Sequence, residues 1–81
     1  MDEALRNPAK RVVGLKQVLR AVKSGQAAKV YLCTDADEFI YRQVESACEE
    51  HKVPIIQTDS MEALGKACLI AVKTAAAAIL R

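Results

Sequence analysis

Three cations and an amide recur at helical spacing in the segment "GLKQVLRAVKSGQ", residues 14–26. Lys16, Arg20 and Lys23 lie four and three positions apart, so a helix would align them in one stripe with Gln17 beside it. Ammonium and guanidinium groups bind phosphates, and a glutamine amide can hydrogen-bond the edge of a base. The pattern indicates a nucleic-acid contact, although a solvated basic helix face would have the same composition.

The start of this helix favours the same chemistry. Gly14 precedes it and would let a phosphate backbone approach closely, and the first turn contains no acid. Unpaired N–H groups at the start of a helix attract anions, and an acid there would cancel that attraction. We therefore expect an open, positively polarised helix end at Gly14.

An apolar stripe beside the cations must hold this helix on a core. Leu15, Val18, Leu19 and Val22 recur at i, i+3, i+4 and i+7, which is typical of an amphipathic helix. Gly25 is suited to the left-handed position just beyond the last turn. The helix is thus predicted to run from about residue 15 to the residues before Gly25.

Strand-like apolar runs alternate with helical periods along the whole chain. A short turn is predicted at 2–6, strands at 10–13, 28–35, 52–58 and 75–80, and further helices from 35 and from 59. The run Val30–Cys33 is typical of a central strand covered on both faces. The alternation predicts an α/β fold: one domain, residues 1–81, as a three-layer α/β/α sandwich with a mixed, mostly parallel sheet of about four strands.

Acids follow the central strand. Asp35 with Glu38, and Asp59 with Glu62, have the spacing of capping boxes at helix starts. Asp35 and Asp37 also stand where α/β proteins place ligands, so the alternative function is a small receiver-like or ligand-binding domain that uses these two carboxylates. A receiver is normally half again as long, which favours capping and solvation for these acids.

The remaining polar residues form no catalytic set. Cys33, Cys48 and Cys68 are odd in number and widely spaced, and His51 is the only histidine. We predict buried, reduced cysteines, no metal or cofactor, and no enzymatic activity. No run is long enough to span a bilayer and the first residues lack a signal-peptide pattern, so we expect a cytoplasmic protein without a membrane partner.

Charge is divided unevenly along the chain. Residues 1–29 carry a net charge of +5, residues 30–62 carry −6 and residues 63–81 carry +3, which leaves +2 overall. Such a chain can present a basic face and an acidic face. A protein-interaction module built on the alanine-rich end is a further alternative, weaker than the other two.

The segment "VVGLKQVLRAVKSGQAAKVYLCTDAD", together with "MEALGKAC", "IAV" and the alanine run, resembles the archaeal-type ribosomal kink-turn-binding proteins of the L7Ae/L30e family. The short length and the "G-x-K-Q" form are most similar to its bacterial YbxF branch. The resemblance covers residues 10–81. It implies an α/β/α sandwich in which the helix after the glycine enters the major groove of an RNA kink-turn beside tandem sheared G·A pairs.

By position, the resemblance also implies a contact from the acid after the central strand and an apolar contact of Ile70 and Val72 with unpaired bulge nucleotides. The RNA-binding residues predicted from the stripe and from the resemblance are Gly14, Lys16, Gln17, Arg20, Lys23, Asp35, Leu69, Ile70, Ala71, Val72 and Lys73. The family's commoner residues at 16 and 17 are asparagine and glutamate, and its loop more often reads glycine–isoleucine–acid–valine–glycine where this chain has "LIAVK". The expected partner is structured RNA with a kink-turn, in ribosomal RNA or a riboswitch, bound by a monomer.

Overall fold

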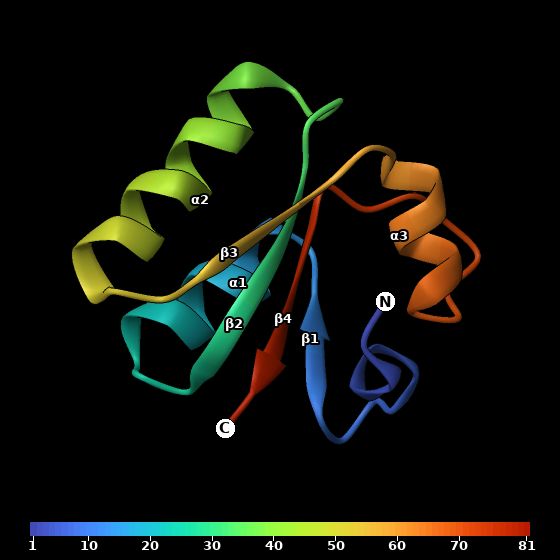
Figure 1. The fold of residues 1–81 in the computed structure, drawn as a ribbon, viewed down its shortest axis with the longest axis horizontal. Coiled ribbons are helices and arrows are strands. Elements are labelled where there is room, and N and C mark those ends of the chain that lie inside the picture. Colours follow the sequence, from blue (N-terminus) through green and yellow to red (C-terminus); the bar gives the residue numbers. More distant parts are fainter.

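A computed structural model describes all residues, 1–81, and places four strands in one sheet between two layers of helices (Figure 1). The strand order is β1-β4-β2-β3. In chain order the elements are the 3₁₀ turn η1 (Glu3–Arg6), β1 (Arg11–Val13), α1 (Leu15–Lys23), β2 (Ala27–Cys33), α2 (Glu38–His51), β3 (Ile55–Thr58), α3 (Met61–Ala67) and β4 (Ala76–Leu80). The predicted α/β/α sandwich is confirmed, with all four strands and all three helices in the predicted segments.

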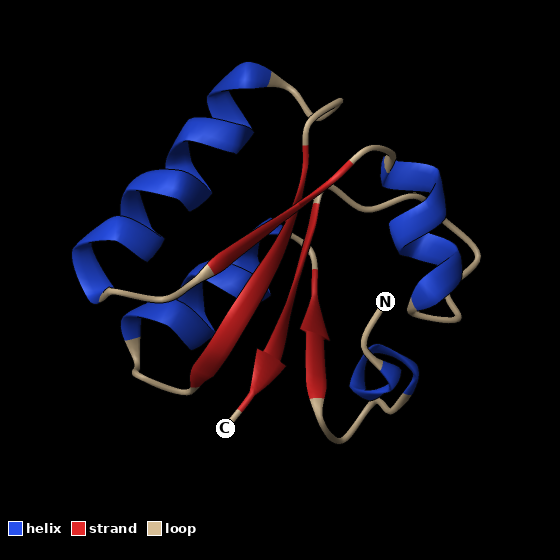
Figure 2. Ribbon diagram, viewed as in Figure 1, coloured by secondary structure: helices blue, strands red, loops and turns tan.

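Different helices cover the two faces of the sheet (Figure 2), and each face has its own apolar core. On one face, α1 and α2 pack against β2 side chains such as Val30 and Leu32. On the other face, α3 and η1 pack against Tyr31 and Cys33 of the same strand. Because successive side chains of a strand point to opposite faces, a strand covered on both sides must be apolar throughout. The continuous apolar run of β2 therefore marks a central strand, as expected.

The sheet is mixed, as predicted, but most of its strand pairs are antiparallel, not parallel. Only β2 and β3 pair in parallel, whereas β4 pairs antiparallel with both β1 and β2. β1, β2 and β3 do run in one direction, as strand–helix alternation requires. However, the segment after α3 doubles back along that helix, and the backbone N–H of Thr74 donates to the carbonyl of Met61 (3.2 Å). β4 consequently starts at the edge where the other strands end, and it enters the sheet between two of them.

The alanine-rich end forms the central strand β4, as predicted, although alanine is the best helix former. Ala76, Ala77 and Ala78 are fully buried, in contact with helices on both faces. Small side chains let both helix layers approach the middle of the sheet closely. Tertiary packing therefore overrides the local helix propensity of this segment.

The helix caps differ from the two predicted capping boxes. α2 begins after Asp37, whose carboxylate accepts from the N–H groups of Phe39 and Ile40. α3 begins after Ser60, whose hydroxyl accepts from the N–H of Ala63 (3.1 Å). Both caps lie one or two residues after the predicted ones, because the chain needs extra residues to turn out of the sheet.

The three cysteines are buried and unpaired, as expected for small apolar core residues. Burial raises the pKa of each thiol, most strongly that of Cys48, to about 11. The side chains of His, Cys, Asp and Glu do not gather into a group of three that could hold a metal ion. None of the helices has the length and apolar character needed to cross a membrane.

Candidate functional site

The start of α1 depends on a backbone conformation that only glycine adopts readily. Gly14 has φ 93° and ψ 158°, and a Cβ atom there would meet nothing within 4 Å. The glycine is thus required by its dihedral angles, with open space in front of it. Gly14 is the single residue between β1 and α1, so the chain turns directly from the strand into the helix and the helix start lies at the end of β1.

α1 is the one α-helix whose first turn has no side-chain cap and no acid. The N–H groups of Leu15, Lys16 and Gln17 make no hydrogen bond within the protein. Unpaired N–H groups together with the helix dipole produce a positive potential at this end. The predicted open helix start is therefore present, and it faces solvent.

The side chains of Lys16, Gln17, Arg20 and Lys23 are all exposed, and none forms an ion pair or a hydrogen bond with another residue. Lys16, Arg20 and Lys23 form the expected stripe, called here the basic stripe. A rise of about 1.5 Å per residue places Lys23 roughly 10 Å along the helix from Lys16. Lys23 is thus at the far end of α1, away from the helix start.

Backbone hydrogen bonds join the start of α1 to the start of β4. The N–H of Gly14 donates to the carbonyl of Ala76 (3.0 Å), and the N–H of Cys33 donates to the carbonyl of Ala75 (2.9 Å). The ends of β1 and β2 and the segment that enters β4 therefore meet at one edge of the sheet, at the top of Figure 1. We call this the carboxyl edge.

Asp35 also lies at the carboxyl edge, but its carboxylate is partly engaged. One oxygen accepts a hydrogen bond from the N–H of Met61, the first residue of α3 (3.0 Å). Asp35 therefore ties the β2–α2 loop to the start of α3. The predicted capping of α2 by Asp35 is wrong, since Asp37 caps that helix. For the RNA contact that the resemblance implies, Asp35 has only its second oxygen free of a protein hydrogen bond.

The loop Leu69–Lys73 follows α3 and returns toward the carboxyl edge. Leu69 and Val72 are 63% and 68% exposed, whereas Ile70 is half-buried and packs against the core between α3 and the sheet. Ala71 and Lys73 are exposed. The loop thus presents Leu69 and Val72 to solvent, and the predicted apolar contact of Ile70 is available only in part.

Hydrogen bonds fix the backbone where the loop Leu69–Lys73 leaves α3. α3 ends in a Schellman motif, in which Ile70 N–H donates to Gly65 (3.1 Å) and Leu69 N–H to Lys66 (3.0 Å). Arg11 adds a further clamp, because its guanidinium donates to the carbonyls of Leu5 and Cys68, each at 3.0 Å. Arg11 therefore holds the end of α3 in place, and it is half-buried, unlike the cations of the basic stripe.

Phe39 is a surface residue that sequence reasoning missed. It lies in the first turn of α2 and is 71% exposed. The buried face of α2 contains Val44, Ala47 and Cys48, and Phe39 lies off that face. An aromatic residue off the buried face of an amphipathic helix was the available signal.

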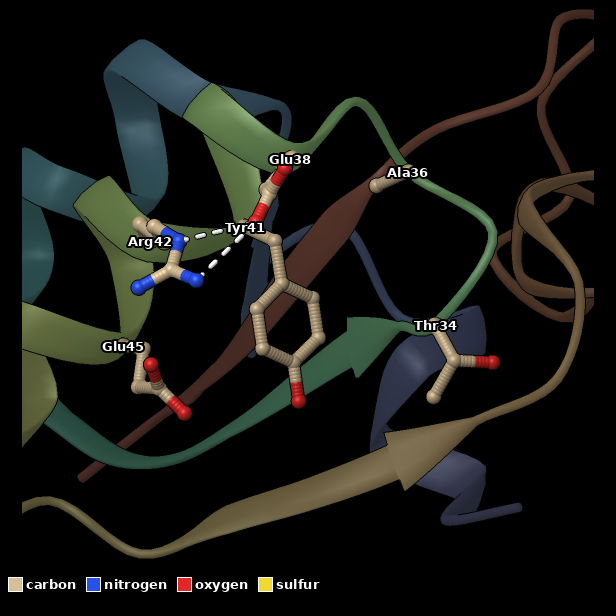
Figure 3. A pocket seen from close by; sticks show the side chains of 6 residues that line it. All are labelled: Thr34, Ala36, Glu38, Tyr41, Arg42 and Glu45. Carbon is tan, nitrogen blue, oxygen red and sulfur yellow. Dashed lines mark hydrogen bonds and ion pairs between the residues drawn. The ribbon is translucent and has the colours of Figure 1, made fainter.

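A hollow of ≈ 380 Å³ lies beside the end of β2, near the two acids of the alternative ligand site (Figure 3). Its lining residues are Thr34, Ala36, Glu38, Tyr41, Arg42 and Glu45. Arg42 and Glu38 neutralise one another across 2.9 Å, and Tyr41 accepts from Gln57 (2.6 Å). Asp35 and Asp37 do not line this hollow. Their carboxylates accept hydrogen bonds from the first turns of α3 and α2. A receiver-type site built on those two acids is therefore not assembled.

The fold and site define a small α/β/α sandwich with an open, basic helix start at the carboxyl edge of its sheet. The chain belongs to the ribosomal protein L7Ae/L30e/S12e/Gadd45 family, whose pattern it matches over residues 2–81. Among its relatives, an RNA-binding protein of Geobacillus thermodenitrificans is 49% identical over 79 residues, which cover 98% of this chain and 96% of the relative. The RNA-binding protein YbxF of Geobacillus stearothermophilus is 47% identical with the same coverage.

Solved structures share the fold. The Giardia lamblia 15.5kD RNA binding protein superimposes with a TM-score of 0.88 at 31% identity, over 98% of this chain and 67% of that protein. A protein of unknown function from Bacillus halodurans superimposes with a TM-score of 0.86 at 21% identity, over 98% of this chain and 82% of that protein. The family resemblance expected from the two sequence motifs is thereby confirmed.

Proposed function

We propose that residues 1–81 act as one RNA-binding domain that recognises a kink-turn and performs no catalysis. The observation that carries this proposal is the open start of α1, with its free N–H groups and unpaired cations, beside an exposed apolar loop. Relatives of nearly the same length are named RNA-binding proteins, which supports RNA as the ligand.

Each part of the surface has a distinct role in this proposal. The N–H groups of α1 and the cations Lys16 and Arg20 hold phosphates, while Gln17 reaches a base edge. A kink-turn is a sharply bent duplex with bulged nucleotides, and its unstacked bases need apolar cover. Val72, on the loop that returns to the carboxyl edge, provides that cover, and Leu69 extends the apolar surface along α3. In a kink-turn, the bend places the RNA groove and the bulged nucleotides close together. The groove would lie on the start of α1 and the bulge on the loop Leu69–Lys73.

The test compares a kink-turn RNA with a straight duplex of equal length in a gel shift. We expect tight binding of the kink-turn only. Lys16→Ala and Arg20→Ala should each weaken binding and reduce the magnitude of its salt slope by about 1, because each removes a phosphate contact, with the melting temperature nearly unchanged. Lys10→Ala is the matched control, because it removes an exposed cation at the opposite edge of the sheet.

Two results would contradict the proposal. Equal affinity for both RNAs would leave only general RNA binding, and parental affinity in both α1 variants would show that another surface is used. The receiver-like alternative predicts the opposite pattern: Mg²⁺ binding measured by calorimetry, lost in Asp37→Asn, and no retardation of RNA.

A further inference from the structure

Arg11 is a half-buried cation that forms no ion pair. Its guanidinium donates instead to two backbone carbonyls, from Nε to Leu5 of η1 and from Nη2 to Cys68 at the end of α3, each at 3.0 Å. A guanidinium is a planar fork whose donors have fixed directions, so the two bonds hold the two carbonyls at a set separation. Arg11 therefore joins the start of β1 to both elements that cover the α3 side of the sheet.

The bond to Cys68 fixes one particular peptide unit. The carbonyl of Cys68 and the N–H of Leu69 belong to the same planar group. Arg11 donates to the carbonyl, and the N–H donates to the carbonyl of Lys66 (3.0 Å). Both polar atoms of this peptide unit are engaged, so its plane cannot rotate without breaking a hydrogen bond.

Leu69, which follows this peptide unit, has a strained backbone. Its φ is 59°, in the left-handed region that glycine adopts readily and leucine does not. Rotation of the preceding peptide plane would relieve the strain, and it would change the direction in which the loop Leu69–Lys73 leaves α3. Arg11 opposes that rotation. The position of Val72 depends on this direction, because the loop returns along α3 and meets Gly65 there.

We infer that Arg11 is a positioning residue for RNA binding, which acts through the carbonyl of Cys68 to keep Leu69 left-handed and the loop Leu69–Lys73 in place. This inference rests on the proposed function and extends it to a residue that does not touch RNA. Arg11 lies at the start of β1, whereas Gly14 and the carboxyl edge lie at its end. A cation in this role stabilises a loop conformation and contributes no phosphate contact.

The experiment measures affinity for a kink-turn RNA, the salt dependence of that affinity and thermal unfolding. Arg11→Met removes both donors at similar side-chain length, and Arg11→Lys keeps the charge without the planar fork. Lys10→Ala removes the neighbouring exposed cation and is the matched control. A loop that occupies its binding position only part of the time lowers the apparent affinity by that fraction.

We expect Arg11→Met and Arg11→Lys each to lose about 3- to 10-fold in affinity, and Lys10→Ala to match the parent. The slope of log affinity against log salt should keep its parental value in all three variants, because no phosphate contact is lost. Lys16→Ala, in contrast, should reduce that slope.

A second background tests how Arg11 acts. Glycine adopts a φ near 59° without strain, so the loop of Leu69→Gly should not need the bond from Arg11. Adding Arg11→Met to Leu69→Gly should therefore cost less than about 2-fold relative to Leu69→Gly alone. The comparison stays within one background, so any contact of the leucine side chain with RNA cancels.

Parental affinity in folded Arg11→Met or Arg11→Lys overturns the inference. A reduced salt slope in Arg11→Met would make Arg11 a phosphate contact, and an equal loss in both backgrounds would show that it does not act through Leu69. Where Arg11→Met does not fold, Arg11→Lys decides by the same criteria in both backgrounds. A parent protein that binds no RNA contradicts the proposed function itself.

Discussion

Gly65 of α3 lies directly against the backbone carbonyl of Val72, so that a Cβ atom at position 65 would collide with that oxygen. The same atom would come within 3.1 Å of the Cα of Lys73. At Gly65, helix α3 and the returning loop are therefore in direct backbone contact. The exposed position of Val72 depends on the missing side chain of a buried helical residue.

Gly65→Ala should displace the loop and weaken kink-turn binding. Alanine favours helix by about 1 kcal/mol over glycine, so any fall in melting temperature must come from the collision. We expect both a lower melting temperature and a lower affinity. Ala63→Gly, on the exposed side of the same helix, should lower stability while the affinity of the folded protein stays at the parental value. Unchanged affinity in Gly65→Ala would show that the loop position is irrelevant to binding.

Leu69→Gly should stabilise the protein. Leu69 has φ 59° at the position where Schellman motifs favour glycine, and a side chain in this left-handed region costs about 1–2 kcal/mol. The equivalent position after α1 is Gly25, with φ 78°. Relief of 1 kcal/mol would raise the melting temperature by roughly 4–8 °C. If RNA affinity falls in this more stable variant, the leucine side chain contacts RNA; a lower melting temperature would contradict the strain.

Carboxylates placed in the loop separate contact from folding. Val72→Asp is expected to leave the melting temperature near the parental value, because Val72 is exposed, and to abolish binding by repelling phosphate and removing apolar contact. Ile70→Asp should lower the melting temperature as well, since Ile70 packs partly on the core. A folded Val72→Asp protein that binds the kink-turn fully would exclude the loop from the interface.

Salt should weaken binding only moderately. With the helix start and the basic stripe as the main phosphate contacts, the slope of log affinity against log salt should be about −3 to −5. Arg20→Ala should reduce the magnitude of the slope by about 1, provided that Arg20 contacts a phosphate. Titrations at several salt concentrations measure both quantities, and a slope near zero would mean that the basic stripe is a solvated face.

Alkaline pH should destabilise the fold through Cys48. Burial raises the pKa of this thiol from 9.0 to about 11, so the thiolate forms more readily in the unfolded chain. The free energy of unfolding is therefore unaffected by ionisation of Cys48 below pH 9, and it falls by about 1–3 kcal/mol as the pH rises toward 11. Denaturant unfolding of the parent and of Cys48→Ala across this range measures the difference. Identical losses in the two proteins would assign the alkaline effect to other groups.

Local patterns in the sequence were sufficient to predict the helices and strands and the helix that carries the basic stripe. The period of Leu15, Val18 and Val22, with Gly25 behind it, placed α1 and its end correctly, because a helix and its terminal motif depend on neighbouring residues. The open, acid-free start of α1 is equally local. The apolar run of β2 predicted a central strand because burial on two faces excludes polar side chains.

Only the tertiary structure decided which ends meet. The antiparallel entry of β4, the use of Asp35 to cap α3, and the clamp from Arg11 to Cys68 join residues that are far apart along the chain. Sequence spacing carries no signal for such contacts. The partition of the loop into exposed Val72 and half-buried Ile70 follows from the same cause, since exposure is set by what packs alongside. The sequence by itself therefore determined the helix that presents the cations. The tertiary structure determined that β4, Asp35 and the loop Leu69–Lys73 lie where they do relative to that helix.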